Sequence, residues 1–510
     1  MLGFGTLGHV LRLSRAGFVL AREGAFVDLE KYAPSGGRFG VRIVNLMARR
    51  GVTGFAGLAN AIDRLGPSYV KLGQFLSTRP DIVGTRLAIE LEKLQDRVPP
   101  QPREVAVAQI EEAFGQPIGA LFFEFGEAVA AASVAQVHRA KVRDQDGQRD
   151  VAVKVLRPGV ERRFARDLSD MAFAARLAER LAPELRRLRL SEVVATLERS
   201  VRIEMDLRLE AAAASEFGEN VRADDEMRAP AVDWDRTTRE VFTMGWMDGE
   251  PIADPQRLAA KGHDPARVAR ALIQSFLRHA LRDGFFHADM HQGNVFVDES
   301  GRIVVVDFGI MGRLGRKERR FLAEILYGFI TRDYLRVAQV HFDAGYVPKT
   351  YRVEDFAQAI RAIGEPIHSR TADRISMAKL LTLLFEVTAL FDMSTRLELV
   401  MLQKTMVVVE GVARKLDPHF NMWAIAEPVV GAWIANNLGV RGRAEEVRET
   451  LASLARVVTS LPGRVDELSR QMSPSANIHT DSSRPIMPPS AIVALWLLAL
   501  AALIFAFLQI

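Results

Sequence analysis

The sequence predicts an α+β fold of two lobes, with helices ahead of both and one transmembrane helix at the C-terminus. Strand-like runs with alternating or β-branched residues lie close together at 121–125, 133–142 and 150–156. Helical periodicity dominates from Pro255 to about residue 470. A small mixed β lobe followed by a larger helical lobe accounts for both observations.

The composition fits a globular protein and excludes several classes of function. The chain has 510 residues, of which 48% are hydrophobic and 25% charged, and this length allows about three domains. Its 67 basic and 63 acidic residues give a net charge of only +4, which argues against a nucleic-acid partner. Because the chain has no cysteine, disulfides, iron–sulfur clusters, thiolate metal sites and cysteine nucleophiles are excluded.

Residues 1–115 form the first predicted region, an N-terminal helical extension. Between residues 40 and 115, apolar side chains recur at helical spacing, for example Leu87, Leu91 and Leu94 on one face. This is the period of an α-helix, so the region is expected to be helical.

Residues 116–250 form the predicted β lobe. The Asp-Gly pair at 146–147 lies between two strand-like runs and predicts a hairpin turn. A long helical stretch follows, from about residue 160 to residue 217. Two further strands, at 230–234 and 239–244, are expected to close the lobe.

Residues 251–471 form the predicted helical lobe, which one short strand at 302–308 interrupts. The apolar run at 377–391 is expected to lie in the core. Glu386 within this run, and the position of the run ahead of an anchored tail, also allow a lipid-facing role.

Two C-terminal segments predict a membrane anchor. Residues 472–489 are rich in Ser and Pro and are expected to form a tether. Residues 490–510 are uncharged, and about 20 helical residues span about 30 Å, the thickness of the hydrocarbon layer. A buried core helix is the alternative. Basic residues precede this segment and none follows it, so the body of the chain is expected on the cytoplasmic side.

The segment 287–309 carries the candidate chemistry. It begins with the tripeptide H-A-D, whose carboxylate is Asp289, continues to Asn294, and ends with a D-F-G tripeptide that starts at Asp307. Protein kinases place their catalytic loop and metal-binding D-F-G at this spacing. Asn294 and Asp307 offer the hard oxygen ligands that magnesium prefers and are the predicted metal ligands. Asp289 is the predicted base or water-positioning group.

His287 and His291, four residues apart, allow a second interpretation as zinc ligands on a helix. That motif requires Glu directly after the first His. Ala288 occupies the position, and Gly293 disfavours a continuing helix. The kinase-like interpretation is therefore favoured.

Lys154 lies in the strand-like sequence V-A-V-K-V, as the phosphate-binding lysine of kinases lies in V-A-I-K. The usual partner of this lysine is a glutamate on a helix, and Glu210 is the predicted partner. A solvated lysine at a strand edge is the alternative. Lys154 and Glu210 join Asp289 as predicted catalytic residues.

The glycine-rich loop that precedes this lysine in kinases is missing. Residues 128–138, A-V-A-A-A-S-V-A-Q-V-H, take its place. Alanine allows a less close approach of the backbone than glycine does. We therefore expect nucleotide binding to differ from that of ordinary protein kinases.

With these residues in place, the sequence resembles the UbiB family of atypical kinase-like proteins, which is associated with ubiquinone (coenzyme Q) biosynthesis. Four motifs of the family match in addition to the D-F-G: K-x-G-Q at 71–74, the Ala-rich loop at 130–133, E-x-D at 204–206 and H-x-D-x-H-x-x-N at 287–294. The match spans residues 71–309, and the predicted C-terminal anchor agrees with it.

The resemblance implies a protein-kinase-like bilobal fold whose N-terminal extension covers the mouth of the active site. It implies ATP and Mg2+ as cofactors, and ATP hydrolysis or phosphorylation of a small molecule rather than of a protein. The residues expected to fill the space of a peptide substrate, and so to regulate the site, are Lys71, Gln74, Glu204 and Asp206. The residues expected to contact the nucleotide are Ala130, Ala131, Ala132, Ser133, Val134, Ala135, Gln136, Val137, His138, Lys154 and Met244.

Three positions depart from the family pattern. Ala128 and Ala135 stand where Pro and Gly are often found, and Gly245 stands in place of an acidic hinge residue. The contacts with adenine and with the loop are therefore expected to differ. Many bacterial relatives end in two membrane spans, whereas this chain has an apolar segment long enough for one.

The leading hypothesis is a membrane-anchored atypical kinase or ATPase of the bacterial inner membrane that supports ubiquinone biosynthesis. Expected partners are membrane lipid, polyprenylated quinone precursors and other ubiquinone-biosynthesis enzymes, with no nucleic acid; the oligomeric state is left open. A nucleotide-switched pseudokinase scaffold or lipid-presenting module is the alternative. Direct hydroxylation of a polyprenylphenol has less support, because the sequence shows no flavin-binding pattern, cysteine or iron-binding triad.

Overall fold

The computed structural model of the protein describes most of the chain between residues 4 and 438. The described residues are 4–25, 27, 48, 55–77, 83, 87, 90–91, 94, 98–144, 147–181, 186, 189–368, 386–387, 390–393 and 397–438. Among them, no helix combines the length and the apolar character needed to cross a bilayer. The predicted tether at 472–489 and membrane segment at 490–510 lie outside the described residues, as does most of the apolar run 377–391.

In the described part of the N-terminal extension, the helices ahead of the β lobe include α1 (Phe4–Arg22), α3 (Phe55–Leu65) and α4 (Pro67–Ser77). Helix α3 contacts both α1 and α4. A Cβ atom on Gly57 would lie 2.1 Å from the carbonyl oxygen of Glu23. Only glycine therefore lets α3 approach the C-terminal end of α1 so closely.

The predicted apolar face of Leu87, Leu91 and Leu94 packs as expected. These side chains form a small core with Ile62 of α3 and Val70 of α4. These leucines therefore hold α3 and α4 together.

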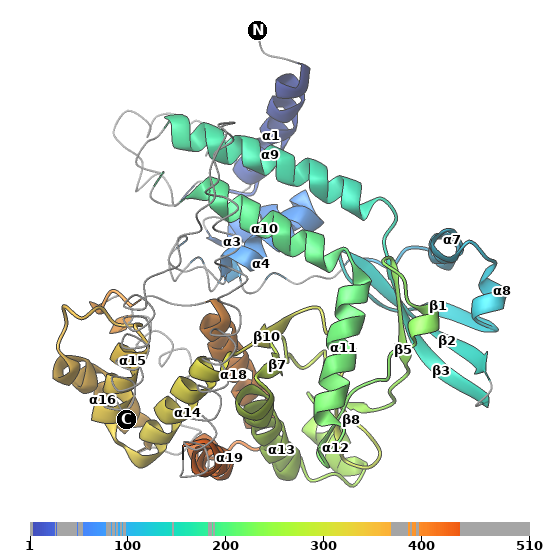
Figure 1. The fold of residues 1–510 in the computed structure, drawn as a ribbon. Helices are drawn as coiled ribbons and strands as arrows, with labels where there is room; N and C mark the ends of the chain where they lie inside the picture. Colours follow the sequence, from blue (N-terminus) through green and yellow to red (C-terminus); the bar gives the residue numbers. More distant parts are fainter. Residues whose placement is uncertain are drawn as a thin grey trace, which may run out of the picture. The chain divides into compact units, whose positions relative to one another are not determined.

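The β lobe is built on a four-stranded antiparallel sheet in the order β1-β2-β3-β5 (Figure 1). Its strands are β1 (Glu124–Ala131), β2 (Ala135–Asp144), β3 (Gly147–Leu156) and β5 (Val241–Gly245). Asp144 pairs with Gly147, which confirms the predicted hairpin between β2 and β3.

The strand predicted at 121–125 begins later in the structure. Leu121 ends the short helix α8 (Ile118–Leu121), and β1 starts only at Glu124 and continues to Ala131. Alanine has a low strand propensity, so the alanine-rich part of β1 gives no strand signal in the sequence. Pairing with β2 determines its structure.

The two faces of β3 belong to different cores. Val153 packs with α7 (Arg103–Phe114) and its neighbours, whereas Ala152 and Leu156 join the main core of the molecule. Successive side chains of a strand alternate between its faces. Lys154 therefore lies on the face of the main core.

In the described part of the stretch predicted as helical at 160–217, the structure contains α9 (Val160–Leu181), α10 (Leu190–Glu204) and α11 (Leu207–Val221). Asp206 separates the last two, because its side chain caps the N-terminus of α11 by accepting from the backbone N–H of Arg208. Helix α11 lies between the sheet and the helical lobe (Figure 1).

The predicted strand at 239–244 is β5, but no strand fills 230–234. Residues Trp234–Arg236 form a 3-10 turn, and Val232 makes a single bridge to Met244. The turn is stabilised by Asp233, which accepts from the backbone N–H of Arg236.

The helical lobe contains several helices. They are α12 (Pro255–Ala260), α13 (Pro265–Arg278), a π-helix (His279–Asp283), α14 (Arg316–Thr331), α15 (Tyr334–Asp343), α16 (Val353–His368), α18 (Leu397–Leu416) and α19 (Met422–Asn437). The predicted strand at 302–308 is present as β9 (Ile303–Val305).

The sequence did not predict the other short strands around β9. They are β4 (Met227–Arg228), β6 (Glu250–Pro251), β7 (Phe285–His287), β8 (Val295–Val297) and β10 (Met311–Arg313). They form two small sheets, β4-β9-β8-β6 and β10-β7. Strands of two or three residues are too short to show a period-two pattern.

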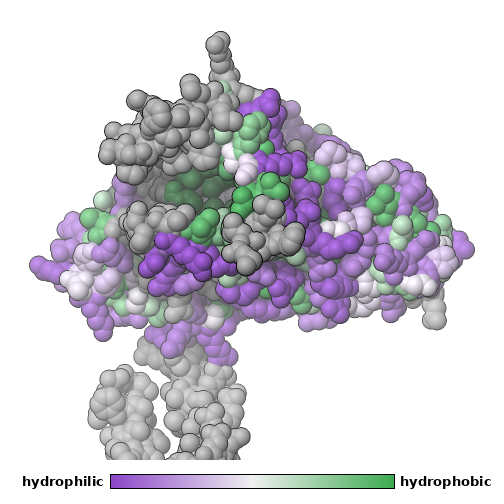
Figure 2. Space-filling view, turned by 90° about the horizontal axis from the view of Figure 1, so that it is seen from above, coloured by the Kyte–Doolittle hydropathy of each residue, from purple (hydrophilic) through white to green (hydrophobic). Residues whose placement is uncertain are grey.

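The main core joins the inner face of the sheet to α11, α13, the short strands, α18 and α19. In the view of Figure 2, hydrophilic side chains cover most of the described surface, and hydrophobic side chains gather near the middle of that face. The described part of the chain thus has the mixed helix-and-sheet, kinase-like fold that the sequence predicts.

Candidate functional site

Lys154 lies at the centre of the site. Its ammonium nitrogen is 2.6 Å from Glu210 Oε1, on α11, and 3.4 Å from Asp307 Oδ1. The side chains of Lys154 and Glu210 are only 16% and 9% exposed, so little water screens their attraction. The structure thus brings together three predicted residues that the sequence places far apart.

Burial and the neighbouring charges shift the pKa values of Lys154, Asp307 and Glu210. Burial alone would lower the pKa of Lys154, but the carboxylates of Asp307 and Glu210 outweigh it and raise this pKa above its usual range. The Lys154 ammonium holds the pKa of the Asp307 carboxyl well below its usual range, whereas burial raises the pKa of Glu210. Asp307 is therefore ionised at neutral pH and suited to bind a cation.

The backbone of Asp307 is strained. Its φ of +68° lies in the left-handed region, which a residue with a Cβ rarely adopts. Two hydrogen bonds hold it there: the carboxylate accepts from the backbone N–H of Gly309 at 3.2 Å, and the carbonyl accepts from His287 Nε2 at 2.6 Å. Strain of this kind is often found at functional sites.

The predicted catalytic loop folds into one hydrogen-bonded unit. The backbone N–H of Asp289 donates to His287 Nδ1 at 3.1 Å, and Asn294 Nδ2 donates to the carbonyl of Asp289 at 3.1 Å. The carbonyl of Asn294 accepts from the N–H of Val306, next to Asp307. The loop thus brings Asn294 beside the D-F-G segment and leaves the Asp289 side chain 42% exposed.

Asn294 and Asp307 carry the kind of oxygen ligand that magnesium prefers. The amide of Asn294 uses its nitrogen on Asp289, so its oxygen is the end that can bind a metal. In the described part of the chain, no group of three or more His, Asp or Glu side chains is placed to hold a metal ion. Two protein ligands suffice where phosphate oxygens and waters supply the remainder.

The zinc interpretation of His287 and His291 does not fit the structure. Both ring nitrogens of His287 make hydrogen bonds with the backbone, one to Asp307 and one to Asp289. Burial also lowers the pKa of His287, so the ring stays neutral and fixes the loop. His291 accepts from the backbone N–H of Gly293 in a turn, not in a helix.

The alanine-rich residues form the end of β1, a turn at 132–134, and the start of β2. Val137 pairs with Lys154 across the two strands and packs against the main core. Gln136 and His138 point to the opposite face, where Gln136 accepts from the N–H of Gln101 at 2.9 Å and donates to His138. Of the nucleotide-binding residues predicted in this segment, these two therefore have side chains on the face away from Lys154.

The buried ring of His138 is held by contacts with β1 and does not point toward Lys154. It donates from Nδ1 to the carbonyl of Gly126 and stacks on Phe125. Burial lowers the pKa of His138.

Met244, the predicted nucleotide contact on β5, is buried and pairs with Ala152.

The predicted regulatory residues do not share one set of contacts. Lys71 of α4 forms an ion pair of 2.6 Å with Glu204 at the end of α10. Gln74 instead donates to the carbonyl of Leu94 at 3.5 Å, and Asp206 caps α11. Leu72 packs against the main core, so α4 lies on the kinase-like part of the molecule.

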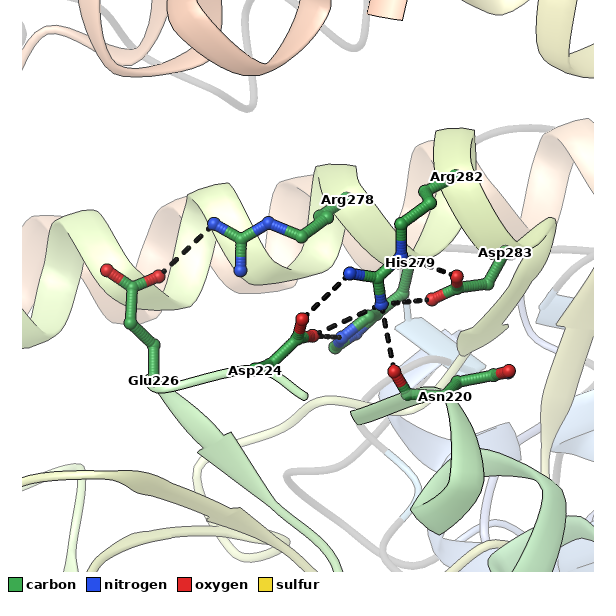
Figure 3. Close-up of polar contacts among 7 residues, drawn as sticks. All are labelled: Asn220, Asp224, Glu226, Arg278, His279, Arg282 and Asp283. Atoms are coloured by element: carbon green, nitrogen blue, oxygen red, sulfur yellow. Dashed lines mark hydrogen bonds and ion pairs between the residues drawn. The ribbon is translucent and has the colours of Figure 1, made fainter. Parts of the chain in front are cut away.

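The residues that fix the C-terminal end of α11 were not predicted from the sequence. Asp224 accepts from His279 Nε2 at 3.0 Å and from Arg282 at 2.7 Å, and Arg282 also donates to the carbonyl of Asn220 (Figure 3). These partners are 55 to 62 residues apart in sequence, with no motif to link them. The π-helix that carries His279 and Arg282 is a rare form often found at functional sites.

A second contact ties α11 to the strand after the D-F-G segment. Arg313 of β10 donates to Glu216 at 2.8 Å. On the same helix, Phe217 packs against Phe308 with ring centroids 5.6 Å apart. Helix α11, which carries Glu210, is thus attached to the helical lobe at several points.

Two family models match the chain. Residues 93–341 match the ABC1 atypical kinase-like domain, and residues 360–421 match the UbiB helical domain. The first range contains the Lys154, Glu210, Asp289, Asn294 and Asp307 set. The predicted regulatory residues Lys71 and Gln74 precede it.

Among solved structures, the chain is similar to Rv3197 from Mycobacterium tuberculosis, determined as a complex with erythromycin. The two chains are 24% identical, and the similarity covers 73% of this chain and 94% of that chain, with a TM-score of 0.51. At this identity, the similarity shows a shared fold.

Proposed function

The chain belongs to the UbiB family of atypical kinase-like proteins, and from this premise we propose that it binds Mg-ATP and transfers or hydrolyses the terminal phosphoryl group. One observation carries the proposal. A buried lysine on β3 contacts both a helical glutamate and the aspartate of a D-F-G tripeptide, which is the arrangement that phosphoryl transfer requires in kinases.

Each residue has a role that follows from its position. Lys154 would bind the α- and β-phosphates, and Glu210 would hold the lysine in place. Asn294 and Asp307 would bind magnesium, which neutralises the charge of the phosphates. Asp289, partly exposed on the same loop as Asn294, would orient the attacking hydroxyl or water and take up its proton.

We propose a small acceptor or water rather than a protein as the phosphoryl acceptor. The ion pair between Lys71 and Glu204 supports this, because it attaches helix α4 to the kinase-like part. A helix in that position would leave less room for a peptide.

The cellular role that we propose is support of ubiquinone biosynthesis at the inner membrane of a bacterium. Residues 490–510 would anchor the protein, with residues 472–489 as a tether and the body in the cytoplasm. Membrane lipid, polyprenylated quinone precursors and other enzymes of the route would be its partners. The uncharged C-terminal segment and the family membership support this role.

The experiment that tests the proposed activity compares the full chain with its Asp307→Asn variant. The wild type should show a magnesium-dependent rise in unfolding temperature with ATP, and magnesium-dependent release of phosphate. Asp307→Asn removes the charge that binds the metal and should abolish both. Full nucleotide binding by the variant would disprove the assignment.

A further inference from the structure

The catalytic loop is supported from a distant part of the chain. Thr405 lies on α18, and its hydroxyl donates to the carbonyl of Ala288 at 2.9 Å. Ala288 stands between His287 and Asp289, the two residues on which the geometry of the loop depends. The contact joins residues that are 117 positions apart.

Burial protects this hydrogen bond from competition by water. Thr405 is only 1% exposed, so water cannot replace its partner. A threonine hydroxyl has one hydrogen to donate, and here it lies within reach of two carbonyls, Ala288 and Met401, the latter one helical turn back at 2.8 Å. The two carbonyls share this hydrogen in a bifurcated bond, and the hydroxyl thus links the backbone of α18 to the backbone of the loop.

The other side of Ala288 is held as well. Its N–H donates to the carbonyl of Ile310, just after the D-F-G segment. Further along the loop, Gln292 accepts from Lys415 of α18 at 3.0 Å. Helix α18 therefore contacts the loop at two points on either side of the exposed Asp289 carboxylate.

We propose that Thr405 is a positioning residue, which holds the catalytic loop and with it the Asp289 side chain in place. This inference rests on the proposed function. It gives the UbiB helical domain, to which Thr405 belongs, a part in catalysis: the domain sets the position of the catalytic loop without touching the reactants.

The chain offers well-matched variants for a test. Thr405→Val keeps the shape of the side chain and removes the donor, whereas Thr405→Ser keeps the donor and removes a methyl group. Thr331→Val is the control, because Thr331 makes the same bond to the carbonyl one turn back, that of Tyr327, but does not contact the loop. Lys415→Met removes the second contact at an exposed position.

The first measurement is steady-state ATP turnover by the full chain. Thr405→Val should lower kcat by about tenfold to a hundredfold, since small displacements of a catalytic group have effects of this size, and should leave KM for ATP within twofold. Thr405→Ser and Thr331→Val should keep wild-type kcat. Equal loss in Thr405→Val and Thr405→Ser, or wild-type kcat in Thr405→Val, would overturn the inference.

The second measurement does not depend on activity. Hydrogen exchange of the peptide 288–294 without ATP should be faster in Thr405→Val by about tenfold, the effect on local opening of losing one hydrogen bond. It should be unchanged in Thr405→Ser and Thr331→Val. Unchanged exchange in Thr405→Val would refute the positioning role. If the wild type had no ATP turnover but the exchange differences were found, the proposed function would be refuted. The positioning of the loop by Thr405 would still be supported.

A last variant covers the case in which Thr405→Val does not fold. Lys415→Met lies at the surface and should fold. It should speed exchange around Gln292 and lower kcat at constant KM. Wild-type exchange and kcat in Lys415→Met would then count against α18 as the support of the loop.

Discussion

Lys154 shows how strongly a single side chain here depends on charges from other parts of the chain. Its type and its strand were predictable, because the V-A-V-K-V pattern places it between inward-facing apolar residues. Its partner Glu210 was predictable from the kinase precedent, and the 2.6 Å contact places it as expected. The contact between Lys154 and Asp307 joins residues 153 positions apart, and a linear motif does not encode a contact that only the folded chain makes.

At Asp289 we predict a separation of binding from turnover. Asp289→Asn should lower ATP turnover by about 10²- to 10⁴-fold, the usual contribution of a general base. It should keep magnesium-dependent ATP binding, because the Lys154 and Asp307 contacts remain. Phosphate release and a thermal-shift titration measure the two properties.

The exposed Asp235 provides the control for this prediction. Asp235→Asn should behave as the wild type in both assays. If Asp289→Asn turned over ATP normally and restored quinone synthesis in a deficient strain, the nucleotide-switched scaffold would be the better description.

At Asp224 we predict a pH-dependent contribution to stability. Burial would raise the pKa of this carboxyl, but the hydrogen bonds from His279 and Arg282 overcome it and hold the pKa well below its usual range. A depressed carboxyl pKa stabilises the folded state fully above the ordinary value of about 4 and loses this contribution as the pH falls further. The stabilisation should therefore be present at pH 7 and decline below about pH 4.

The comparison of wild type with Asp224→Asn measures this contribution. The variant should lose roughly 1–3 kcal/mol at pH 7, as is usual when a buried charged partner is replaced, and the difference in unfolding temperature should shrink towards pH 3. A difference that stayed constant between pH 7 and pH 3 would contradict the charge-based explanation.

At the scale of elements, helices were predicted better than short strands. The helical periodicity of the long stretch after β3 predicted helices there. The Asp-Gly pair predicted the hairpin between β2 and β3. Strands such as β7 and β10 were missed because three residues cannot show alternation. The alanine-rich β1 was misplaced because its pairing with β2, not its composition, makes it a strand.

Asp206 allows a prediction that separates helix capping from regulation. The residue caps α11, so Asp206→Ala should destabilise the protein by about 1 kcal/mol, whereas Asp206→Asn should not, because asparagine is an equally good cap. Thermal unfolding of both variants tests this. Equal destabilisation by Ala and Asn would show that the charge, not the cap, is what matters.

At the scale of the whole molecule, the mixed helix-and-sheet, kinase-like fold was predictable, because the strand-like runs and the helical periodicity occupy separate parts of the sequence. The attachment of α11 to the helical lobe was not. It depends on pairs such as Asp224 with His279 and Arg313 with Glu216, which only the folded chain brings together.

For the complete protein we predict that the membrane couples to the site. ATP turnover by the full chain should rise several-fold in vesicles with anionic lipid and a phenolic quinone precursor, compared with neutral vesicles alone. Asp307→Asn should show no turnover in either. If neither lipid nor precursor changed the rate, a membrane-coupled activity would lose its support.

The contact between Thr405 and Ala288 also bears on biosynthesis. A ribosome releases the N-terminal part of a chain first, and folding begins there. The catalytic loop emerges long before α18, so a nascent chain has its lysine, its carboxylates and its loop before it has the helix that supports the loop. The support of the loop would thus be completed only late in translation, after the residues of the site itself have been made.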